Sequence, residues 1–547
     1  MFTFIKRILA ISLLACSMPL LVSAQVKVSQ KKYKLPILKG KADNPVLTVK
    51  IEVEEETVLE EVEVSLSGTG GVESVNNMKI FTSRNLIGIN DKKDKKPKQF
   101  AETGDIKENT TLMGSLPLER GSTYLQLVLT LNEGANPSAF INVNVIGVKL
   151  NTGKVKIVAD SYASRLGIAL RQHKQDNVHT YRIPGLATAN DGSLLAIYDV
   201  RYNSSRDLQG HMDIGLSRSL DKGKTWLPMQ IVMDMGTWGN LPEKFNGVSD
   251  ANILVDKNTG NIFIAALWMH GVINDRGEWV EGLNENSDNW NHQWRNKGSQ
   301  PGLGVKETAQ FLLIKSTDNG KTWSEPVNLT EMCKRKEWWL WAPAPGQGIT
   351  MKDGTLVIPT QGRNETGKSF SNITYSKDGG KTWKTSNEAV MESTTECMVV
   401  ELSNGNLMLN MRSNENTKDT SKNNGRAIAV TKNLGKTWSI HPTSHRALQE
   451  PVCMASIIRH DFIQDGHKKS VLLFSNPDSK TIRRNLTVKI SYDDGKTWSK
   501  EKKILLDEGR SRGYSCLTSI DNDTIGILYE SSQADLVFQT ININELL

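Results

Sequence analysis

Cysteine is scarce in this sequence, with five residues in a chain of 547. Cys16 lies in the N-terminal apolar segment, and the remaining four, Cys333, Cys397, Cys453 and Cys516, are far apart with no Cys-x-x-Cys pair. Zinc sites and disulfide scaffolds are usually built from closely spaced cysteines. The sequence therefore predicts neither of them, and the fold must be stabilised by its hydrophobic core.

Several other chemical signatures are also missing. The nine histidines are dispersed without a His-Glu-x-x-His motif, and the sequence has no P-loop, no dinucleotide-binding glycine motif and no Gly-x-Ser-x-Gly. It thus gives no support to metal, nucleotide or serine-hydrolase chemistry, and no cofactor is predicted. The one dense basic run, 92–98, has no interleaved aromatic residues and is typical of a solvated loop, so nucleic acid is not a predicted partner.

Long hydrophobic runs are confined to the N-terminus. Two basic residues, Lys6 and Arg7, precede an apolar stretch that ends in a small-residue site at 22–24. This pattern predicts a signal peptide over residues 1–24 and export to the periplasm or the extracellular space, with lipid attachment at Cys16 as the alternative. No later apolar run has the length of a transmembrane segment.

The rest of the composition is that of a globular protein, with 38% hydrophobic and 23% charged residues. A chain of this length is expected to form about two to four domains. The net charge of +7 and the pI near 8.9 are compatible with an anionic substrate.

Residues 25–160 show the alternation of apolar and polar residues that is typical of antiparallel sheets. The apolar members of four such runs are Leu47, Val49, Ile51 and Val53; Val62, Val64 and Leu66; Leu125, Leu127, Leu129 and Leu131; and Ile141, Val143 and Val145. About 130 residues of such strands, with no catalytic constellation, predict a β-sandwich domain. This domain either binds carbohydrate or serves as a spacer.

An eight-residue motif, Ser-x-Asp-x-Gly-x-Thr-Trp, recurs in the remainder of the chain. Its copies lie at 219–226, 316–323, 376–383 and 491–498, with a degenerate copy, in which Asn433 replaces the aspartate, at 431–438. Asp can accept hydrogen bonds from its own turn, Gly can adopt positive φ, and Trp can pack the turn against a sheet. Repeats of this length predict a β-propeller in which the aspartates are structural rather than catalytic.

The interval between the first two copies is about 40 residues longer than the others. The additional segment, 271–304, is polar and contains Trp279, Trp290 and Trp294. Long loops on propellers are often functional. These rings therefore either stack on a sugar or pack within the insertion.

The motif Tyr-Arg-Ile-Pro, at 181–184, precedes the repeats. Because proline disfavours a helical conformation for the residue before it, we expect the motif to hold Arg182 on a stiff, extended backbone. A guanidinium fixed in this way suits bidentate capture of a carboxylate.

The Tyr-Arg-Ile-Pro motif followed by these repeats resembles the exo-sialidases (neuraminidases) of bacteria, over about residues 165–547. The resemblance implies an all-β chain in which a six-bladed β-propeller catalytic domain, 161–547, follows a smaller β-sandwich domain, 25–160. It also implies a metal-independent glycoside hydrolase that releases terminal sialic acid with retention of configuration. Its partners would be sialylated glycoproteins, glycolipids and oligosaccharides.

The resemblance further implies three arginines that bind the substrate carboxylate. Arg182 matches the first and Arg412, in Leu-Asn-Met-Arg, matches the second. Arg483, in Arg-Arg-Asn-Leu-Thr, matches the third, with Arg484 as its competitor. Three guanidiniums around one carboxylate make directional, charge-assisted pairs, and such a cluster is expected only where an anion binds.

The reacting groups are implied in the same way. Asp207 matches the acid/base that protonates the leaving oxygen and then activates water. Tyr514, in Arg-Gly-Tyr-Ser-Cys, matches the nucleophile, and Glu396 matches the glutamate that takes its proton. A neutral phenol avoids the repulsion between a carboxylate nucleophile and the substrate carboxylate, but with a pKa near 10 it needs a base.

Three further residues match substrate contacts: Arg201 near the sugar 4-hydroxyl, Asp250 near the N-acetyl and O4 groups, and Trp268 in the N-acetyl pocket. Because the reacting and carboxylate-binding positions hold the expected residue types, a non-catalytic glycan-binding propeller is disfavoured. A trans-sialidase or an intramolecular trans-sialidase is the closer alternative, since acceptor loops decide between these outcomes.

Overall fold

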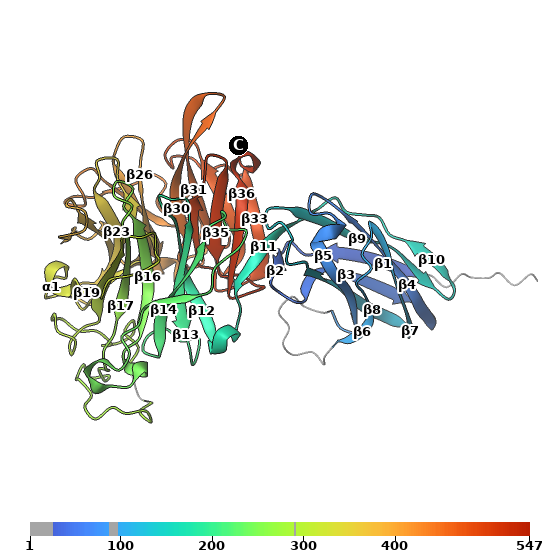
Figure 1. Cartoon of the computed structure of the whole chain (residues 1–547), viewed down its shortest axis with the longest axis horizontal. Helices are drawn as coiled ribbons and strands as arrows, with labels where there is room; N and C mark the ends of the chain where they lie inside the picture. Colours follow the sequence, from blue (N-terminus) through green and yellow to red (C-terminus); the bar gives the residue numbers. More distant parts are fainter. Residues whose placement is uncertain (1–25, 87–96, 289–290) are drawn as a thin grey trace, which may run out of the picture.

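The computed structural model describes residues 26–86, 97–288 and 291–547. The predicted signal peptide with Cys16, most of the basic run and Trp290 lie outside these residues. Within them, nearly all of the regular structure is β, and it forms two parts that lie side by side (Figure 1).

The N-terminal part consists of two layers of antiparallel strands with one core between them. The first sheet has the order β1 (Lys27–Lys32), β3 (Asn44–Val53), β8 (Gly121–Leu131), β5 (Val75–Ser83) and β6 (Lys98–Thr103). The second layer contains β7 (Asn109–Leu118), β4 (Thr57–Ser67), β9 (Phe140–Leu150) and β10 (Gly153–Lys156). The apolar positions of all four predicted runs are buried in the shared core, which confirms the predicted alternation.

The C-terminal part is a series of small antiparallel sheets that follow the chain. The first is β12 (Thr180–Thr188), β13 (Leu194–Arg201), β14 (Met212–Ser219) and β15 (Gln230–Met233). The second is β16 (Val248–Val255), β17 (Ile262–Trp268), β18 (Gln310–Ser316) and β19 (Val327–Asn328), with β21 (Gly346–Gln347) paired to β16. The third is β20 (Leu340–Pro343), β23 (Leu356–Arg363), β24 (Ser369–Ser376) and β25 (Lys384–Thr385), with β22 (Ile349–Thr350) paired to β23.

The remaining sheets continue this pattern. The fourth is β26 (Thr394–Glu401), β27 (Leu407–Ser413), β28 (Ala427–Thr431) and β29 (Ser439–Ile440). The fifth is β30 (Ser456–Gln464), β31 (His467–Pro477), β32 (Arg484–Ser491) and β33 (Lys503–Arg510). The last is β34 (Ser515–Ser519), β35 (Thr524–Tyr529) and β36 (Leu536–Asn542).

One strand links the two parts of the molecule. β11 (Ser164–Arg171) pairs with β36 on one side and, at Ser164 and Arg165, with β9 of the N-terminal part. β2 (Ile37–Lys39) runs parallel to β11. A strand that precedes the first C-terminal sheet thus completes the last one.

The first strands of successive sheets lie against one another. β12 contacts β16 and β34, and β30 contacts β26 and β34. An all-β chain with this sheet order fits a β-propeller.

The repeated motif forms the turn between the third and fourth strands of these sheets. Ser219 Oγ donates to Asp221 and accepts the N–H of Gly223 at 2.8 Å, and Thr225 donates its N–H and hydroxyl to Asp221 at 2.9 and 2.7 Å. Equivalent bonds are made at Asp318, Asp378, Asn433 and Asp493. These side chains carry the hydrogen bonds of their own turns, as predicted.

In the described part of the chain, helical structure is limited to short segments. They are α1 (Thr330–Cys333) and the 3-10 turns η1 (Val72–Ser74), η2 (Gln175–Asn177), η3 (Trp238–Asn240), η4 (Glu243–Phe245), η5 (Asn414–Thr417) and η6 (Ile543–Glu545). Among the described residues, none of these has the length and apolar character needed to cross a membrane. The four cysteines in this part of the chain are buried, free thiols.

Candidate active site

The predicted reacting residues meet at one end of the first strands of the C-terminal sheets. Arg182 lies near the start of β12, Asp250 near the start of β16 and Glu396 near the start of β26, while Tyr514 directly precedes β34. A cavity of about 450 Å³ opens at this end, and its lining includes Asp207, Asp250, Glu396, Arg412 and Tyr514. The fold therefore brings together residues that are widely separated in the sequence.

Tyr514 lies at the centre of this arrangement. It is 5% exposed, its hydroxyl donates to Glu396 Oε1, and Arg412 Nη1 donates to the hydroxyl oxygen at 3.0 Å and to Glu396 Oε2 at 2.6 Å. Burial and the charge of Glu396 raise the pKa of the phenol well above its usual value, against the opposing effect of nearby arginines. Tyr514 is thus a neutral phenol whose proton already points at a carboxylate.

All three predicted arginines contact the Tyr514 side chain. The guanidinium carbon of Arg182 lies 5.2 Å from the ring centroid and that of Arg483 lies 5.6 Å from it, while Arg412 binds the hydroxyl. Three guanidiniums around one ring repel one another, and the carboxylates of Glu396 and Glu530 offset part of this repulsion. The cluster is therefore suited to a carboxylate ligand.

Arg483, rather than its neighbour, reaches this cluster. Its Nη2 donates to the carbonyl of Val452 at 2.7 Å and its Nη1 to that of Arg512 at 3.0 Å, which fixes the guanidinium beside Tyr514. Arg484 begins β32 and is exposed. Of the two candidates for the third arginine, the geometry favours Arg483.

Arg182 is held by a carboxylate that the sequence analysis missed. Its Nε donates to Glu530 at 2.9 Å, and Glu530 also accepts the backbone N–H groups of Ile183 and Tyr514 at 3.1 and 3.0 Å. Burial opposes ionisation of Glu530, but Arg182 and these hydrogen bonds lower its pKa below the usual value. No local pattern signals this role, because Glu530 and Arg182 are 348 positions apart.

Replacing Glu530 by glutamine is expected to lower the free energy of unfolding by about 3–5 kcal/mol, because Arg182 would keep its burial and lose its buried counter-ion. Urea denaturation followed by tryptophan fluorescence measures this loss. Glu392→Gln is the matched control, since Glu392 pairs with Lys368 at 3.2 Å on the surface, where such pairs contribute at most about 1 kcal/mol. Equal losses in the two variants would contradict the assignment of Glu530 as the anchor of Arg182.

The backbone of the Tyr-Arg-Ile-Pro motif differs from the one predicted. Arg182 pairs with Asp199 of β13, but the register shifts between Arg182 and Gly185, and Ile183 has a φ of 60°. This left-handed geometry is strained for a β-branched residue. The expected extended backbone is thus present at Arg182 and wrong for Ile183, whose N–H donates to Glu530 instead of a neighbouring strand.

Asp207 lies at the cavity between two arginines. Arg201 Nη1 donates to its Oδ1 at 2.6 Å, and Arg182 Nη1 lies 3.5 Å from the same oxygen. Burial favours the neutral acid, but the charges of Arg201 and Arg182 outweigh it and lower the pKa of Asp207 to about 2. In the unliganded protein Asp207 is therefore a carboxylate.

Arg201 is 1% exposed and is committed to protein partners. It donates to Asp199 at 2.8 Å and to the carbonyls of Ser205 and Arg206 at 3.1 and 2.9 Å. These contacts orient the loop that carries Asp207. The expected contact between Arg201 and the sugar 4-hydroxyl stays a prediction.

Asp250 faces the cavity, whereas Trp268 packs among other rings. Burial and the charges of Asp199 and Glu396 raise the pKa of Asp250 well above its usual value, which favours its protonated form. Trp268 is 3% exposed and packs edge-on against Trp238, with ring centroids 4.9 Å apart. The predicted role of Trp268 in an N-acetyl pocket stays a prediction.

The long insertion adds a second group that the sequence analysis missed. His292 Nε2 lies 3.7 Å from Asp207, and Nδ1 accepts the backbone N–H of Trp294 at 3.1 Å. Burial lowers the pKa of His292 to about 4, so the neutral ring carries its proton on Nε2, facing Asp207.

Of the tryptophans of the insertion, Trp294 lines the cavity, while Trp279 packs against His270 with ring centroids 5.6 Å apart. The described part of the chain contains no cluster of three or more His, Cys, Asp or Glu that could hold a metal ion.

Comparison with known proteins shows the family to which the chain is similar. Residues 183–530 match a BNR repeat-like domain, and residues 25–154 match the N-terminal domain of BNR-repeat neuraminidase. A sialidase of Bacteroides fragilis is 39% identical over 560 residues, covering 97% of each chain, and a sialidase of Paraclostridium sordellii is 30% identical, covering 65% of this chain and 82% of its own. The solved structure of Hadza microbial sialidase Hz136 superposes with a TM-score of 0.84 at 36% identity, covering 95% of this chain and 100% of that one.

The chain therefore belongs to the BNR-repeat neuraminidase family of bacterial sialidases. Within that class it is a glycoside hydrolase, an exo-α-sialidase. An intramolecular trans-sialidase from Ruminococcus gnavus shares the fold, with a TM-score of 0.52 at 19% identity.

Proposed function

We propose that this sialidase retains configuration and uses Tyr514 as nucleophile, Glu396 as its base and Asp207 as acid/base. The observation that supports this most directly is the hydrogen-bonded pair of Tyr514 and Glu396 on the cavity wall. Arg182, Arg412 and Arg483 surround this pair and would together bind the carboxylate of a terminal sialic acid, in addition to the contacts that Arg182 makes with Glu530 and Arg412 makes with Glu396.

The proposed reaction has two displacements at the anomeric carbon. In the first, the Tyr514 oxygen bonds to this carbon and its proton passes to Glu396, while the bond to the leaving oxygen breaks and Asp207 gives that oxygen a proton. In the second, Asp207 takes a proton from water, the water oxygen displaces the Tyr514 oxygen, and Glu396 returns the proton to Tyr514. Two inversions at one carbon retain the configuration.

In the first step Asp207 must carry a proton, which its low pKa in the free enzyme disfavours. Asp207 is ionised in the free enzyme because Arg182 and Arg201 lower its pKa to about 2. A substrate carboxylate bound at Arg182 offsets part of this positive charge, which raises the pKa of Asp207 in the complex. Substrate binding thus helps to protonate the acid that cleaves it.

The pH profile of kcat is expected to differ from that of kcat/KM, because substrate binding raises the pKa of Asp207. The acid must be protonated, so activity is lost as pH rises through the pKa of Asp207. That pKa is higher in the complex, so the alkaline loss of kcat should occur at higher pH than the loss of kcat/KM, which reports the free enzyme. Steady-state rates on sialyllactose across the acidic and neutral range test this, with an aryl sialoside as the control that needs little protonation. If kcat and kcat/KM on sialyllactose were lost over the same pH range, the proposed effect of substrate binding on the pKa of Asp207 would be contradicted.

We propose that Asp250, in its protonated form, is a hydrogen-bond donor in the same cavity. A neutral carboxylic acid can donate to the carbonyl of an N-acetyl group or to a sugar hydroxyl oxygen, which an ionised carboxylate cannot do. Its raised pKa supports this role. Arg201 would act beside it by keeping Asp199 and the Asp207 loop in position.

The domain boundaries, the number of propeller blades and the cellular location are also proposals. We propose a β-sandwich domain over 25–160 and a six-bladed propeller over 161–547, closed by the pairing of β11 with β36; the order of the sheets supports this division. The basic and apolar pattern of residues 1–24 supports export to the periplasm or the cell exterior.

One assay separates the alternatives. The purified protein is incubated with a chelator and sialyllactose, and the first product is identified by proton NMR and mass spectrometry. We expect free sialic acid, formed first as the α-anomer. A β-anomer would refute retention, a 2,7-anhydro sugar would indicate an intramolecular trans-sialidase, and transfer to added lactose would indicate a trans-sialidase. Binding without turnover would indicate a non-catalytic glycan-binding propeller.

A further inference from the structure

A second cavity lies at the opposite end of the strands that carry the active site. It has a volume of about 400 Å³, and its lining includes Thr188 at the end of β12, Glu401 at the end of β26 and Ser519 at the end of β34. A strand rises about 3.3 Å per residue, so the six steps from Arg182 to Thr188 separate the two cavities by about 20 Å. This second cavity is distinct from the one that holds Tyr514.

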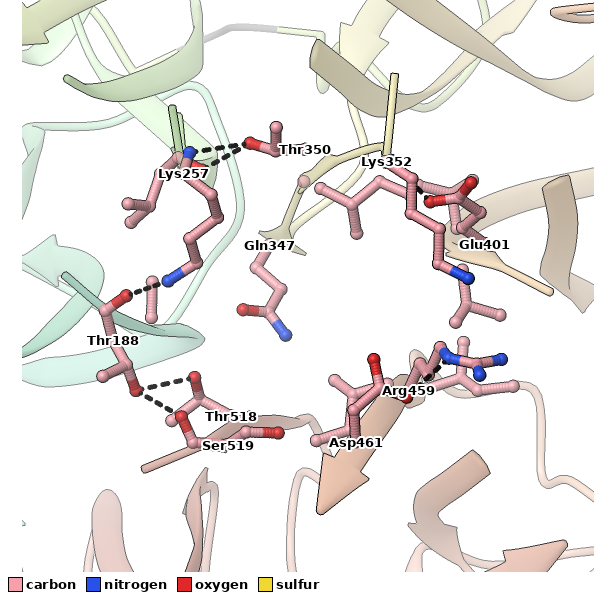
Figure 2. Close-up of a pocket in the computed structure, with 18 residues that line it drawn as sticks. Thr188, Lys257, Gln347, Thr350, Lys352, Glu401, Arg459, Asp461, Thr518 and Ser519 are labelled. Carbon is pink, nitrogen blue, oxygen red and sulfur yellow. Dashed lines mark hydrogen bonds and ion pairs between the residues drawn. The ribbon is translucent and has the colours of Figure 1, made fainter. Parts of the chain in front are cut away.

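Three cationic side chains line this second cavity. Figure 2 shows Lys257 on one side and Lys352 and Arg459 on the other, with Gln347 between them. Lys257 Nζ donates to the carbonyl of Thr188 at 2.7 Å. Within residues 26–86, 97–288 and 291–547, neither lysine forms an ion pair with a carboxylate. Burial, with no opposing negative charge, lowers the pKa of Lys257.

The two acids of the cavity leave these lysines uncompensated. Glu401 accepts the backbone N–H of Lys352 at 2.9 Å, and Asp461 Oδ1 accepts the Nε–H of Arg459 at 2.8 Å. Three cations and two anions give the lining a net charge of +1. An incoming anion therefore meets two ammonium groups that form no ion pair within the described residues, in a lining whose net charge is positive.

The rest of the lining is suited to a polyhydroxylated body. The Gln347 amide donates to the carbonyl of Leu517 at 2.7 Å, which keeps the side chain in place between the lysines (Figure 2). Amide, carboxylate and hydroxyl oxygens such as those of Gln347, Asp461 and Ser519 can exchange hydrogen bonds with sugar hydroxyls. Aliphatic side chains of the lining, among them Val399, offer a surface for ring C–H groups.

We propose that this second cavity binds a small anionic sugar. Its carboxylate pairs with Lys257, which has no acidic partner among the described residues, and its hydroxyls bond to Gln347, Lys352 and the neighbouring oxygens. The proposal is independent of the mechanism assigned to Tyr514, because the two cavities share no lining residue.

Isothermal titration calorimetry of the full chain with sodium glucuronate tests the proposal. We expect saturable binding, with methyl glucoside, which lacks the carboxylate, failing to bind. Lys257→Met and Lys352→Met are each expected to raise the Kd at least about tenfold, the effect of one charged hydrogen bond. Lys224→Met, which removes an exposed lysine outside the lining, should leave the Kd unchanged.

Two further measurements assign the binding to this cavity. Sialic acid release by Lys257→Met should match that of the unmodified chain, whereas Arg412→Met should lose release and keep its affinity for glucuronate. Loss of glucuronate binding in Arg412→Met would overturn the proposal, since the active site would then be the binding site. Absence of saturable binding, or binding of inorganic phosphate without glucuronate, would overturn it as well.

Discussion

Tyr514→Phe is expected to reduce the rate of sialic acid release at least about 10³-fold, as removal of a nucleophile does in other covalent mechanisms. The hydroxyl oxygen is the only atom removed, and Glu396 keeps its 2.6 Å contact with Arg412. The fold should therefore survive, with a loss of stability near 1 kcal/mol for the missing hydrogen bond. Rates on sialyllactose and the thermal unfolding midpoint measure the two effects.

Tyr181→Phe provides the matched control for this variant. Tyr181 is also buried, and its hydroxyl donates to the carbonyl of Gln175 at 3.1 Å, away from the cavity. Tyr181→Phe should lose about as much stability as Tyr514→Phe, and its rate of sialic acid release should fall no more than a few-fold. A 2,3-difluorinated sialic acid loses its 2-fluoride in the first displacement, and its 3-fluorine slows the second, so the peptide that contains Tyr514 should gain the mass of a 3-fluorosialosyl group in place of the phenolic proton. Near-normal turnover by Tyr514→Phe, or labelling of another residue, would refute the nucleophile.

Asp207→Asn is expected to lower release from sialyllactose by about 10²–10⁴-fold, the usual contribution of a positioned general acid. Asparagine preserves the shape of the side chain but has no acidic proton for the leaving oxygen. The loss should be much smaller on an aryl sialoside, because a phenolate departs without protonation. Comparing kcat on the two substrates separates loss of the acid from a general disturbance of the cavity.

The neighbouring histidine supplies the control for Asp207. His292→Gln removes the ring that faces Asp207 and keeps a donor near it, while leaving Arg201 and Arg182 in place. We expect a modest loss, of similar size on both substrates. If Asp207→Asn also lost activity equally on the two substrates, its assignment as general acid would fail.

Local patterns in the sequence were sufficient for much of the fold. The alternation at Leu125 to Leu131 predicted a buried strand face, and the Ser-x-Asp-x-Gly-x-Thr-Trp motif predicted turns whose hydrogen bonds the structure contains. Both depend on residues within a few positions of one another. Such short-range constraints can be recognised without knowing the rest of the fold.

The long-range parts of the site could not be predicted in this way. Glu530 has no motif of its own, and its partners Arg182 and Ile183 are brought to it because the first C-terminal sheet packs against the last one. His292 lies in an insertion whose composition only indicated a loop. The rule for residues before proline failed at Ile183 for the same reason, since a distant carboxylate captures its N–H and overrides the local preference.

The strand shared between the two parts also bears on protein engineering. A catalytic fragment that began after residue 160 would keep β11 paired with β36 but would lose β9 and β2 from its other side. Unpaired strand edges pair with other chains and promote aggregation. The N-terminal part thus covers this sheet edge, and a shortened enzyme would need charged or proline substitutions on β11 to resist aggregation.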